Sequence, residues 1–243
     1  MSDNRPQSDA EVDWTRFHSQ DESWRTRLLG DLSTAFAIPR YVDLFFETFG
    51  EDRALTFLEV GAGNGEVPRR VLDRDPECVS RYTTSEIFPE GARWLRSVGL
   101  PSLSSDALHL PFRDRSFDAV ISYDVLHHVS DPFLMAREMA RVSRGRLFLT
   151  ESNGLSVGRK LMEQTEGHRA TGERSYTPRQ YRRFFAKAGP LRDFRIRPFL
   201  FPLPGGTPKP LLQPLILFNH IIERVPFFRW QCSNVVMTVE FES

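Results

Sequence analysis

Two hydrophobic patterns alternate along the chain from residue 55 onward. Short runs with strand character, the first of them apolar like a buried parallel strand, lie at 55–60, 82–87, 102–105, 117–123 and 146–150. Segments with helical character lie between them at 67–72, 89–97 and 132–142. Strands that alternate with helices in this way predict βαβ units around a mostly parallel sheet, and therefore an α/β fold class.

Other patterns flank this alternation. Residues 31–49 carry apolar residues at helical spacing, and Pro39 is expected to break this segment in two. Thr177 and Pro178 form a helix start that leads to Gly189, and two strand candidates follow at 194–199 and 235–241.

The segment between these two strands predicts an amphipathic helix. The apolar face of this helix would consist of Leu211, Leu215, Phe218, Ile222 and Val225, widened by Leu212, Ile216 and Ile221. The polar side would consist of Gln213, His220, Glu223 and Arg224.

Composition excludes several classes of protein. The 243 residues are 40% hydrophobic and 26% charged, which is enough apolar content for a packed core and rules out global disorder. Cys78 and Cys232 are the only cysteines, which argues against a disulfide framework or a structural zinc site. The polar N-terminus lacks the apolar core of a signal peptide, and no apolar run is long enough to span a membrane, so a cytoplasmic protein is expected.

Charge is neutral in total but divided unevenly along the chain. The 32 basic and 32 acidic side chains cancel, which argues against a nucleic-acid-binding protein held by its overall charge. Residues 1–151 carry 18 Lys and Arg against 25 Asp and Glu, whereas residues 152–243 carry 14 against 7. The C-terminal third is therefore basic.

The most informative segment is the glycine-rich turn after the strand at 55–60, with the sequence Glu59-Val-Gly-Ala-Gly-Asn-Gly-Glu66. Glycines let the backbone turn tightly and let a ligand approach the main chain. A dinucleotide site requires G-x-G-x-x-G, and here Glu66 stands at the third glycine, where its charge opposes a pyrophosphate. An NAD-type oxidoreductase is therefore disfavoured.

The same turn resembles the E-x-G-x-G-x-G motif of the class I S-adenosylmethionine-dependent methyltransferases, with Glu59, Gly61, Gly63 and Gly65 at its four fixed positions. The resemblance implies that these residues bind the amino-acid end of S-adenosylmethionine, whose ammonium is attracted by a carboxylate. It also implies that Glu86 accepts hydrogen bonds from both ribose hydroxyls, and that Asp106 and Ala107 contact the adenine edge. The full set of expected cofactor-binding residues is Glu59, Gly61, Ala62, Gly63, Gly65, Glu86, Ile87, Asp106, Ala107 and Tyr123.

The segment from Ser116 to Pro132 resembles the family's fourth strand and its LHHV-x-DP continuation. The turn Ser143-Arg144-Gly145 departs from the family's usual proline and double glycine. The resemblance implies a doubly wound, Rossmann-like sheet of seven strands with an N-terminal helical lid and a C-terminal insertion before the last strand. Expected domains are residues 1–50 as tail and lid, 51–151 as the S-adenosylmethionine-binding core, and 152–243 as the C-terminal half with the specificity insertion.

Two histidines are candidate catalytic residues. His127 and His128 follow the fourth strand at the carboxyl edge of the sheet, where ligands bind in open α/β folds. Either could act as a general base, with His128 preferred, or both could pack locally. Tyr123, Asp124 and Trp24 are expected to contact the acceptor substrate. The remaining histidines show no metal-ligand spacing, so no metal is expected.

These patterns predict methyl transfer from S-adenosylmethionine to a small, hydrophobic metabolite at O, N or C. The alternatives are an NAD-type oxidoreductase and a non-catalytic S-adenosylmethionine-binding module. No nucleic-acid partner is expected. The segment 199–230 could be a lid over an apolar acceptor, an interface or a peripheral membrane contact, because it combines apolar residues with the basic C-terminal third. The sequence leaves these choices and the oligomeric state open.

Overall fold

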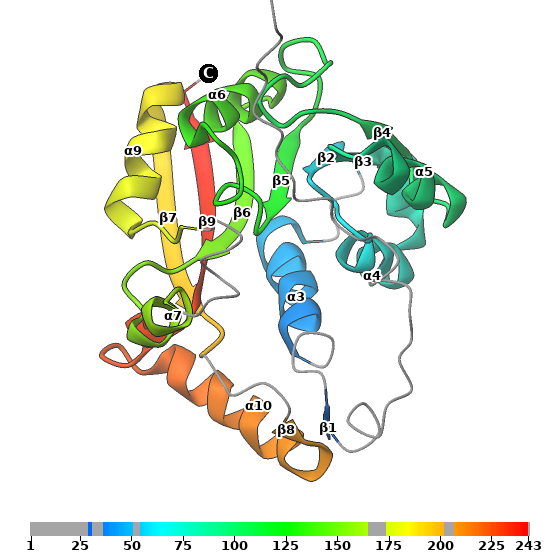
Figure 1. Ribbon diagram of the computed structural model, residues 1–243. Coiled ribbons are helices and arrows are strands. Elements are labelled where there is room, and N and C mark those ends of the chain that lie inside the picture. The colour runs from blue at the N-terminus through cyan, green and yellow to red at the C-terminus, as the bar shows by residue number, and fades with distance from the viewer. Residues whose placement is uncertain (1–28, 31–35, 51–53, 165–173, 202–206, 243) are drawn as a thin grey trace, which may run out of the picture.

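The computed structural model describes residues 29–30, 36–50, 54–164, 174–201 and 207–242 (Figure 1). In this part of the chain one seven-stranded sheet forms, as expected. Its strands lie in the order β4 (Ser102–Ser104), β3 (Tyr82–Glu86), β2 (Phe57–Val60), β5 (Ala119–Tyr123), β6 (Arg146–Ser152), β9 (Asn234–Phe241) and β7 (Leu191–Phe199). A separate short pair joins β1 (Leu29–Gly30) to β8 (Thr207–Pro208).

The sheet is parallel except at β9, which runs antiparallel to both β6 and β7. The chain winds outward from β2 to β4 and then returns to β5 on the other side of β2. The strand order therefore reverses between β2 and β5. Ligands of open α/β sheets bind beyond the carboxyl ends of the strands at such a reversal.

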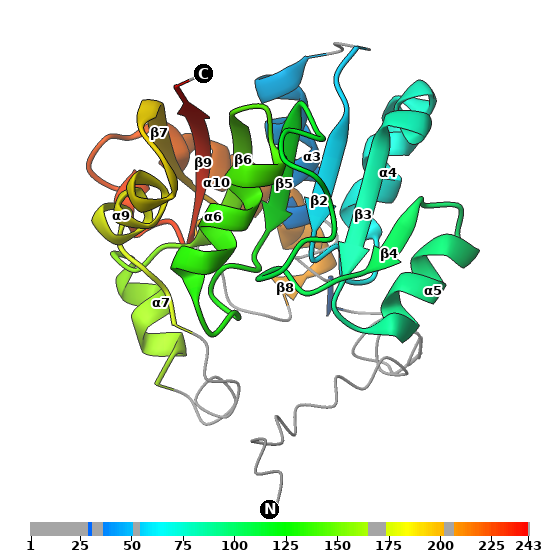
Figure 2. The ribbon, with the colours of Figure 1, turned by 90° about the horizontal axis from the view of Figure 1, so that it is seen from above.

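Helices cover both faces of the sheet. Figure 2 shows α3 (Ile38–Phe49) and α4 (Glu66–Arg74) on one face, and α6 (Pro132–Val142) and α9 (Pro178–Ala188) on the other. The remaining helical elements are η2 (Pro76–Arg81), α5 (Pro89–Ser97), α7 (Val157–Met162), α10 (Lys209–Arg224) and η3 (Arg229–Gln231). Within the described ranges, no helix is long and apolar enough to cross a membrane.

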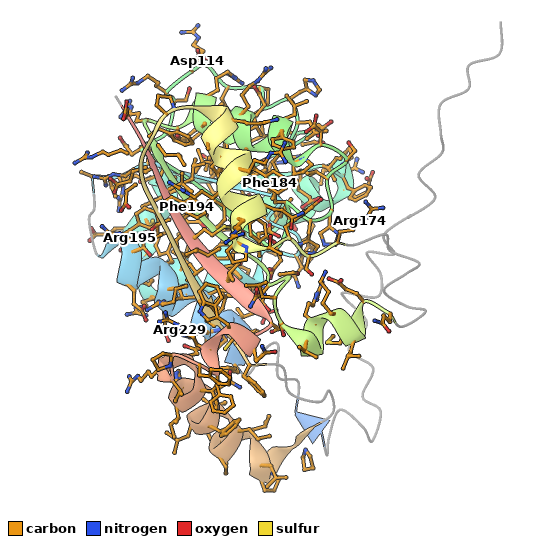
Figure 3. The ribbon with its side chains drawn as sticks, turned by 90° about the vertical axis from the view of Figure 1, so that its left-hand side faces the viewer. Asp114, Arg174, Phe184, Phe194, Arg195 and Arg229 are labelled. Atoms are coloured by element: carbon orange, nitrogen blue, oxygen red, sulfur yellow. The ribbon has the colours of Figure 1, made fainter. Side chains whose placement is uncertain are left out.

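Alternate residues of β2 supply two separate hydrophobic cores, as the two-residue period of a strand requires. Leu58 and Val60 belong to the cluster under α6 and α9, whereas Phe57 belongs to the cluster under α3. Phe184 of α9 and Phe194 of β7 mark the first of these layers in the side view of Figure 3. Both faces of the sheet are therefore packed, which explains the continuous apolar run at 55–60.

Helix α3 begins at Ile38, and Pro39 lies in its first turn, where the missing N–H is not needed. Residues 31–35 lie outside the described residues, so the division of the 31–49 segment at Pro39 stays a prediction. Helix α3 then packs Tyr41, Leu44 and Phe45 against the sheet. Trp24 and the other residues at 1–28 and 31–35 of the predicted tail and lid lie outside the described residues.

The predicted division of the 211–225 helix into apolar and polar sides describes the packing of α10 only in part: Gln213 and Arg224 are exposed as expected, but other residues are not placed as predicted. Glu223, assigned to the polar side, is only 9% exposed. Leu211, Phe218 and Ile221, assigned to the apolar face, are 52%, 42% and 53% exposed. The physical reason is that polar contacts, described below, hold Asn219 and Glu223 inside.

Candidate cofactor and acceptor site

The glycine-rich turn joins the end of β2 to the start of α4. The N–H groups of Gly61 and Ala62 both donate to the carbonyl oxygen of Ser85, at 2.9 and 3.0 Å, which ties the turn to β3. Gly61 has φ +74°, and a Cβ added there would lie 2.5 Å from Cγ2 of Val125. Only glycine fits this close approach, so the turn lies directly against the segment that follows β5.

Glu86 connects this turn to the end of β3. Its Oε2 accepts from the N–H of Gly63 and its Oε1 accepts from the N–H of Ile87, both at 2.9 Å. Gly63 has φ +55°, and a Cβ added there would meet no atom within 4 Å. A carboxylate held in a fixed orientation beside open space fits the expected binding of a ribose diol.

Glu59 lies on β2 and is 1% exposed. The Tyr82 hydroxyl donates to its Oε2 at 2.6 Å. Burial raises the pKa of the Glu59 carboxyl to about 8, against the opposing effect of the Tyr82 hydrogen bond, and the charge of Glu86 adds to the rise. A cation bound nearby would stabilise the ionised form, and the role of Glu59 toward the cofactor ammonium stays a prediction.

The raised pKa of Glu59 predicts a measurable pH dependence of stability. The folded chain keeps a proton that the unfolded chain releases above its ordinary pKa of 4.5, so the free energy of unfolding should fall as the pH rises from 4.5 to about 8. In Glu59→Gln the amide oxygen can still accept from Tyr82, but the group no longer titrates. Urea denaturation without cofactor should therefore show the variant gaining on the native protein by about 1 kcal/mol per pH unit within this window. A constant difference would contradict the prediction.

Asp106 lies two residues beyond the end of β4. The N–H of Ser105 donates to the carbonyl oxygen of Glu86 at 2.9 Å, which brings Asp106 next to the ribose-binding candidate. Its Oδ1 accepts from the N–H of Leu108 at 2.8 Å, and its side chain is 48% exposed. Ala107 is buried. The structure therefore places the predicted adenine-binding residues beside Glu86.

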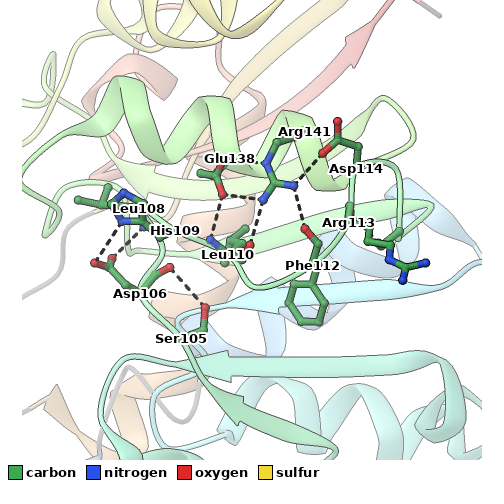
Figure 4. A network of polar contacts seen from close by, with 11 residues as sticks. Ser105, Asp106, Leu108, His109, Leu110, Phe112, Arg113, Asp114, Glu138 and Arg141 are labelled. Carbon is green, nitrogen blue, oxygen red and sulfur yellow. Dashed lines mark hydrogen bonds and ion pairs between the residues drawn. The ribbon is translucent and has the colours of Figure 1, made fainter.

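Arg141 of α6 fixes the loop that carries Asp106, a role the sequence did not indicate (Figure 4). Its guanidinium donates to the carbonyl oxygens of Leu110 and Phe112, at 2.9 and 2.8 Å. It also contacts Glu138, whose Oε2 accepts from the N–H of Leu110. The hydrogen bonds to Glu138, with those to Asp114, raise the pKa of Arg141.

Arg141→Ala is expected to release this loop. The change removes the bonds to two carbonyl groups and leaves Glu138, 11% exposed, without its cation. We expect a loss of about 2 to 4 kcal/mol in the free energy of unfolding and weaker binding of S-adenosylhomocysteine. Chemical denaturation and calorimetry measure the two effects. Arg137→Ala, at an exposed position on the same helix, is the control and should change neither.

A buried carboxylate not identified from the sequence orients one of the two candidate histidines. Glu151 of β6 is fully buried, and its Oε1 accepts from the N–H groups of Val125 and Leu126 at 3.1 and 2.6 Å. Its Oε2 lies 2.7 Å from Nδ1 of His127. In the sequence, the signal that could have identified Glu151 is an acidic residue directly after the predicted strand 146–150. When Nδ1 carries the proton and donates to this carboxylate, Nε2 is the unprotonated nitrogen of the neutral ring.

His127 and His128 differ in their surroundings. His127 is 7% exposed, whereas His128 is exposed, and their ring centroids lie 4.1 Å apart. The pairing with Glu151 belongs to His127, so the geometry favours His127 over His128 as the oriented histidine. The sequence had favoured His128.

Asp124 and Tyr123 bring three elements together at this edge of the sheet. Asp124 has φ +55° and accepts hydrogen bonds from the hydroxyl of Tyr41 and, at 3.2 Å, from Nδ2 of Asn234. The rings of Tyr41 and Tyr123 stack with centroids 5.5 Å apart. Burial, followed by the nearby charge of Glu151, raises the pKa of Asp124. Residues of α3, β5 and β9 are thereby fixed next to the His127–Glu151 pair.

The predicted site residues therefore form two adjoining groups. The glycine turn, Glu86, Ile87, Asp106 and Ala107 form the first, and Tyr123, Asp124 and His127 form the second, with Val125 in contact with the turn.

Glu66 lies in the first turn of α4, next to the glycines, so the electrostatic objection to a pyrophosphate stands. Among the described residues, no three His, Cys, Asp or Glu side chains are placed to bind a metal ion together.

Comparison with known proteins gives a family match and several relatives. Residues 58–149 match the family described as Methyltransferase domain. The chain is 35% identical over 99 residues to the 27-O-demethylrifamycin SV methyltransferase of Amycolatopsis mediterranei, and 28% identical over 85 residues to the tRNA U34 carboxymethyltransferase of Nautilia profundicola. These stretches are 38% and 34% of this chain and cover 36% and 28% of those two proteins, respectively, so the chain spans about a third of the length of the relatives it matches.

A solved structure resembles nearly the whole chain. The crystal structure of a SAM-dependent methyltransferase from Thermotoga maritima matches with a TM-score of 0.63 and 19% identity, over 87% of this chain and 92% of that one. This likeness establishes the fold. The family match over residues 58–149 and the motifs support a class I S-adenosylmethionine-dependent methyltransferase domain in this chain, and this class of domain implies S-adenosylmethionine as the cofactor.

Proposed function

We propose that this chain transfers the methyl group of S-adenosylmethionine to a small, hydrophobic acceptor at an oxygen, nitrogen or carbon atom. The observation that carries the proposal is the Glu86 carboxylate, held by the N–H groups of Gly63 and Ile87 beside open space at the glycine turn. Residues 51–151 would bind the cofactor, and residues 152–243 would select the acceptor.

The residues of the site divide the work between binding and proton transfer. S-adenosylmethionine supplies a methyl carbon activated by a sulfonium when it is bound. Glu59 would attract the cofactor ammonium, Glu86 would bind the ribose hydroxyls, and Asp106 with Ala107 would bind the adenine. Positioning two reactants in this way can contribute about 7 to 11 kcal/mol to catalysis.

His127 would remove the proton of an acceptor hydroxyl or amine at Nε2. Glu151, bonded to Nδ1, would keep that nitrogen protonated and the ring oriented. Asp124 and Tyr123 would shape the acceptor side of the site. Because Nε2 is the basic atom, the acceptor proton would pass to His127 as the methyl group is transferred.

A small acceptor is supported by the relative named for a demethylated rifamycin, and an apolar one by the aromatic residues around the second group of the site. Because another relative is named for tRNA U34, tRNA is included among the acceptors that the experiment tests. The neutral total charge of the chain favours the small molecule.

Calorimetry followed by a turnover screen tests the proposal. The full chain should bind S-adenosylmethionine and S-adenosylhomocysteine and not NAD; binding of NAD alone would overturn the cofactor assignment. With methyl-labelled cofactor, label should pass to a member of a panel of phenols, quinones, lipids and tRNA. Label on tRNA alone would overturn the small acceptor. Cofactor binding without label transfer to any member would favour a non-catalytic binding module.

A further inference from the structure

Helix α10 leaves large apolar side chains in contact with solvent. We define the α10 apolar face as Leu211, Leu217, Phe218, Ile221, Phe227 and Phe228, which are 52%, 62%, 42%, 53%, 83% and 50% exposed. Four of them lie on the helix and two directly after it. An exposed group of this kind marks an interaction site more often than single exposed apolar residues do.

Polar contacts fix the orientation of this helix. The side chain of Asn219 is fully buried: its Oδ1 accepts from the N–H of Phe201 at 2.6 Å and its Nδ2 donates to the Phe201 carbonyl at 3.3 Å. Glu223 accepts from the N–H of Leu200 and from Arg40, both at 3.1 Å. Because Asn219 and Glu223 are bonded inside, Leu217 and Ile221, each two residues before one of them, face outward.

The charges that accompany this face and reach solvent are positive. Arg224 is exposed at the last turn of α10, and Arg229 of η3 is half-buried, its guanidinium lying 5.9 Å from the centre of the Trp230 ring. Glu223 is the only acidic residue between residues 207 and 233, and it is turned inward. A neighbouring anionic surface would therefore meet no exposed carboxylate from this segment.

Helix α10 lies near the edge of the sheet that carries the candidate site. The chain enters α10 from the carboxyl end of β7 and leaves it toward the start of β9, and Phe199 pairs with Asn234 at that edge of the sheet. Helix α10 lies beyond this edge, away from the strands (Figures 1 and 3). It is the same edge that carries the His127–Glu151 pair, because β6 runs parallel to β5 and ends there.

We propose that the α10 apolar face, together with Arg224 and Arg229, binds the surface of an anionic membrane. Leucine, isoleucine and phenylalanine side chains enter the boundary between headgroups and acyl chains, and arginines attract anionic lipids. A second copy of the chain is a less suitable partner for this face. A two-fold contact would bring the arginines of both copies together, and the face offers no exposed carboxylate to pair with them. The proposal does not depend on the acceptor or on catalysis.

Co-sedimentation of the full chain with vesicles tests the proposal. We expect binding to vesicles of equimolar phosphatidylcholine and phosphatidylglycerol, and weaker binding to phosphatidylcholine alone. The double variant Leu217→Gln, Ile221→Gln should lower the partition coefficient by about 100-fold, and Arg224→Gln by about fivefold. Leu217→Met, which keeps the apolar area, and Arg195→Gln, an exposed arginine on β7 (Figure 3), should bind like the native chain.

Three results would overturn the inference. The first is no sedimentation of the native chain with either vesicle, and the second is equal sedimentation of the double variant. The third is a native dimer that the double variant converts to monomers in light scattering, since the face would then be an interface between copies. Calorimetry with S-adenosylhomocysteine on each variant should give unchanged affinity, which separates failure of membrane binding from failure of the proposed function.

Discussion

Glu86→Ala is expected to lower the affinity for S-adenosylmethionine by about 100-fold, because two hydrogen bonds to a charged carboxylate are removed. The change also frees the N–H groups of Gly63 and Ile87, which Glu86 accepts from at 2.9 Å. The glycine turn and the end of β3 would then lose the group that connects them. Isothermal titration calorimetry with S-adenosylmethionine and S-adenosylhomocysteine measures the loss.

A matched control is available on the next helix. Glu90 lies in the first turn of α5 and is 61% exposed. Among the described residues, its carboxylate pairs with Arg93 alone. Glu90→Ala should leave the cofactor affinity unchanged. If Glu86→Ala also binds normally, or if both variants lose binding to the same degree, Glu86 does not bind the ribose. Thermal unfolding of both variants distinguishes lost contacts from lost structure.

His127→Ala should lower kcat by about 10²- to 10⁴-fold for an acceptor that must lose a proton, with little change in cofactor affinity. The reason is that His127 is the histidine whose Nδ1 is bonded to a buried carboxylate, 2.7 Å away. Steady-state turnover with the acceptor found in the label screen measures kcat, and calorimetry measures the affinity.

Glu151→Gln provides the sharper form of this test. The amide oxygen can still accept from the N–H groups of Val125 and Leu126, but the amide nitrogen would face Nδ1 and donate to it. The proton of His127 would then sit on Nε2, which could no longer act as the base. We expect a loss of kcat close to that of His127→Ala. His128→Ala is the control, and a larger loss there than at His127 would return the role to His128.

Local patterns in the sequence were sufficient for most of the individual elements. The predicted helices at 89–97 and 132–142 have the same bounds as α5 and α6. Asp131 caps α6 by accepting from the N–H groups of Phe133 and Leu134, and Thr177 with Gln180 forms a capping box on α9. These signals act within a few residues, so they can be recognised without the rest of the chain.

The conformation of the glycine turn was also predictable, because one motif contains all of its glycines. Gly61 and Gly63 adopt positive φ angles in a turn between a strand and a helix. Glu86 is 23 residues from Gly63, yet it lies at the end of the neighbouring strand, where the parallel register of β2 and β3 brings it to the turn. The family resemblance supplied that spacing.

Side-chain partners that depend on strand order were not predictable. Glu151 meets His127 only because β6 lies beside β5, and Arg141 meets the 105–114 loop only because α6 crosses the face next to it. The orientation of α10 likewise depends on Arg40, which is far from it in sequence, and on Leu200 and Phe201 at the end of β7. Hydrophobic period and turn chemistry are local and so determine the elements and the glycine turn. The pairing of His127 with Glu151, the anchoring of the 105–114 loop by Arg141 and the outward face of α10 were decided by tertiary structure, since each needs a partner that only packing brings within bonding distance.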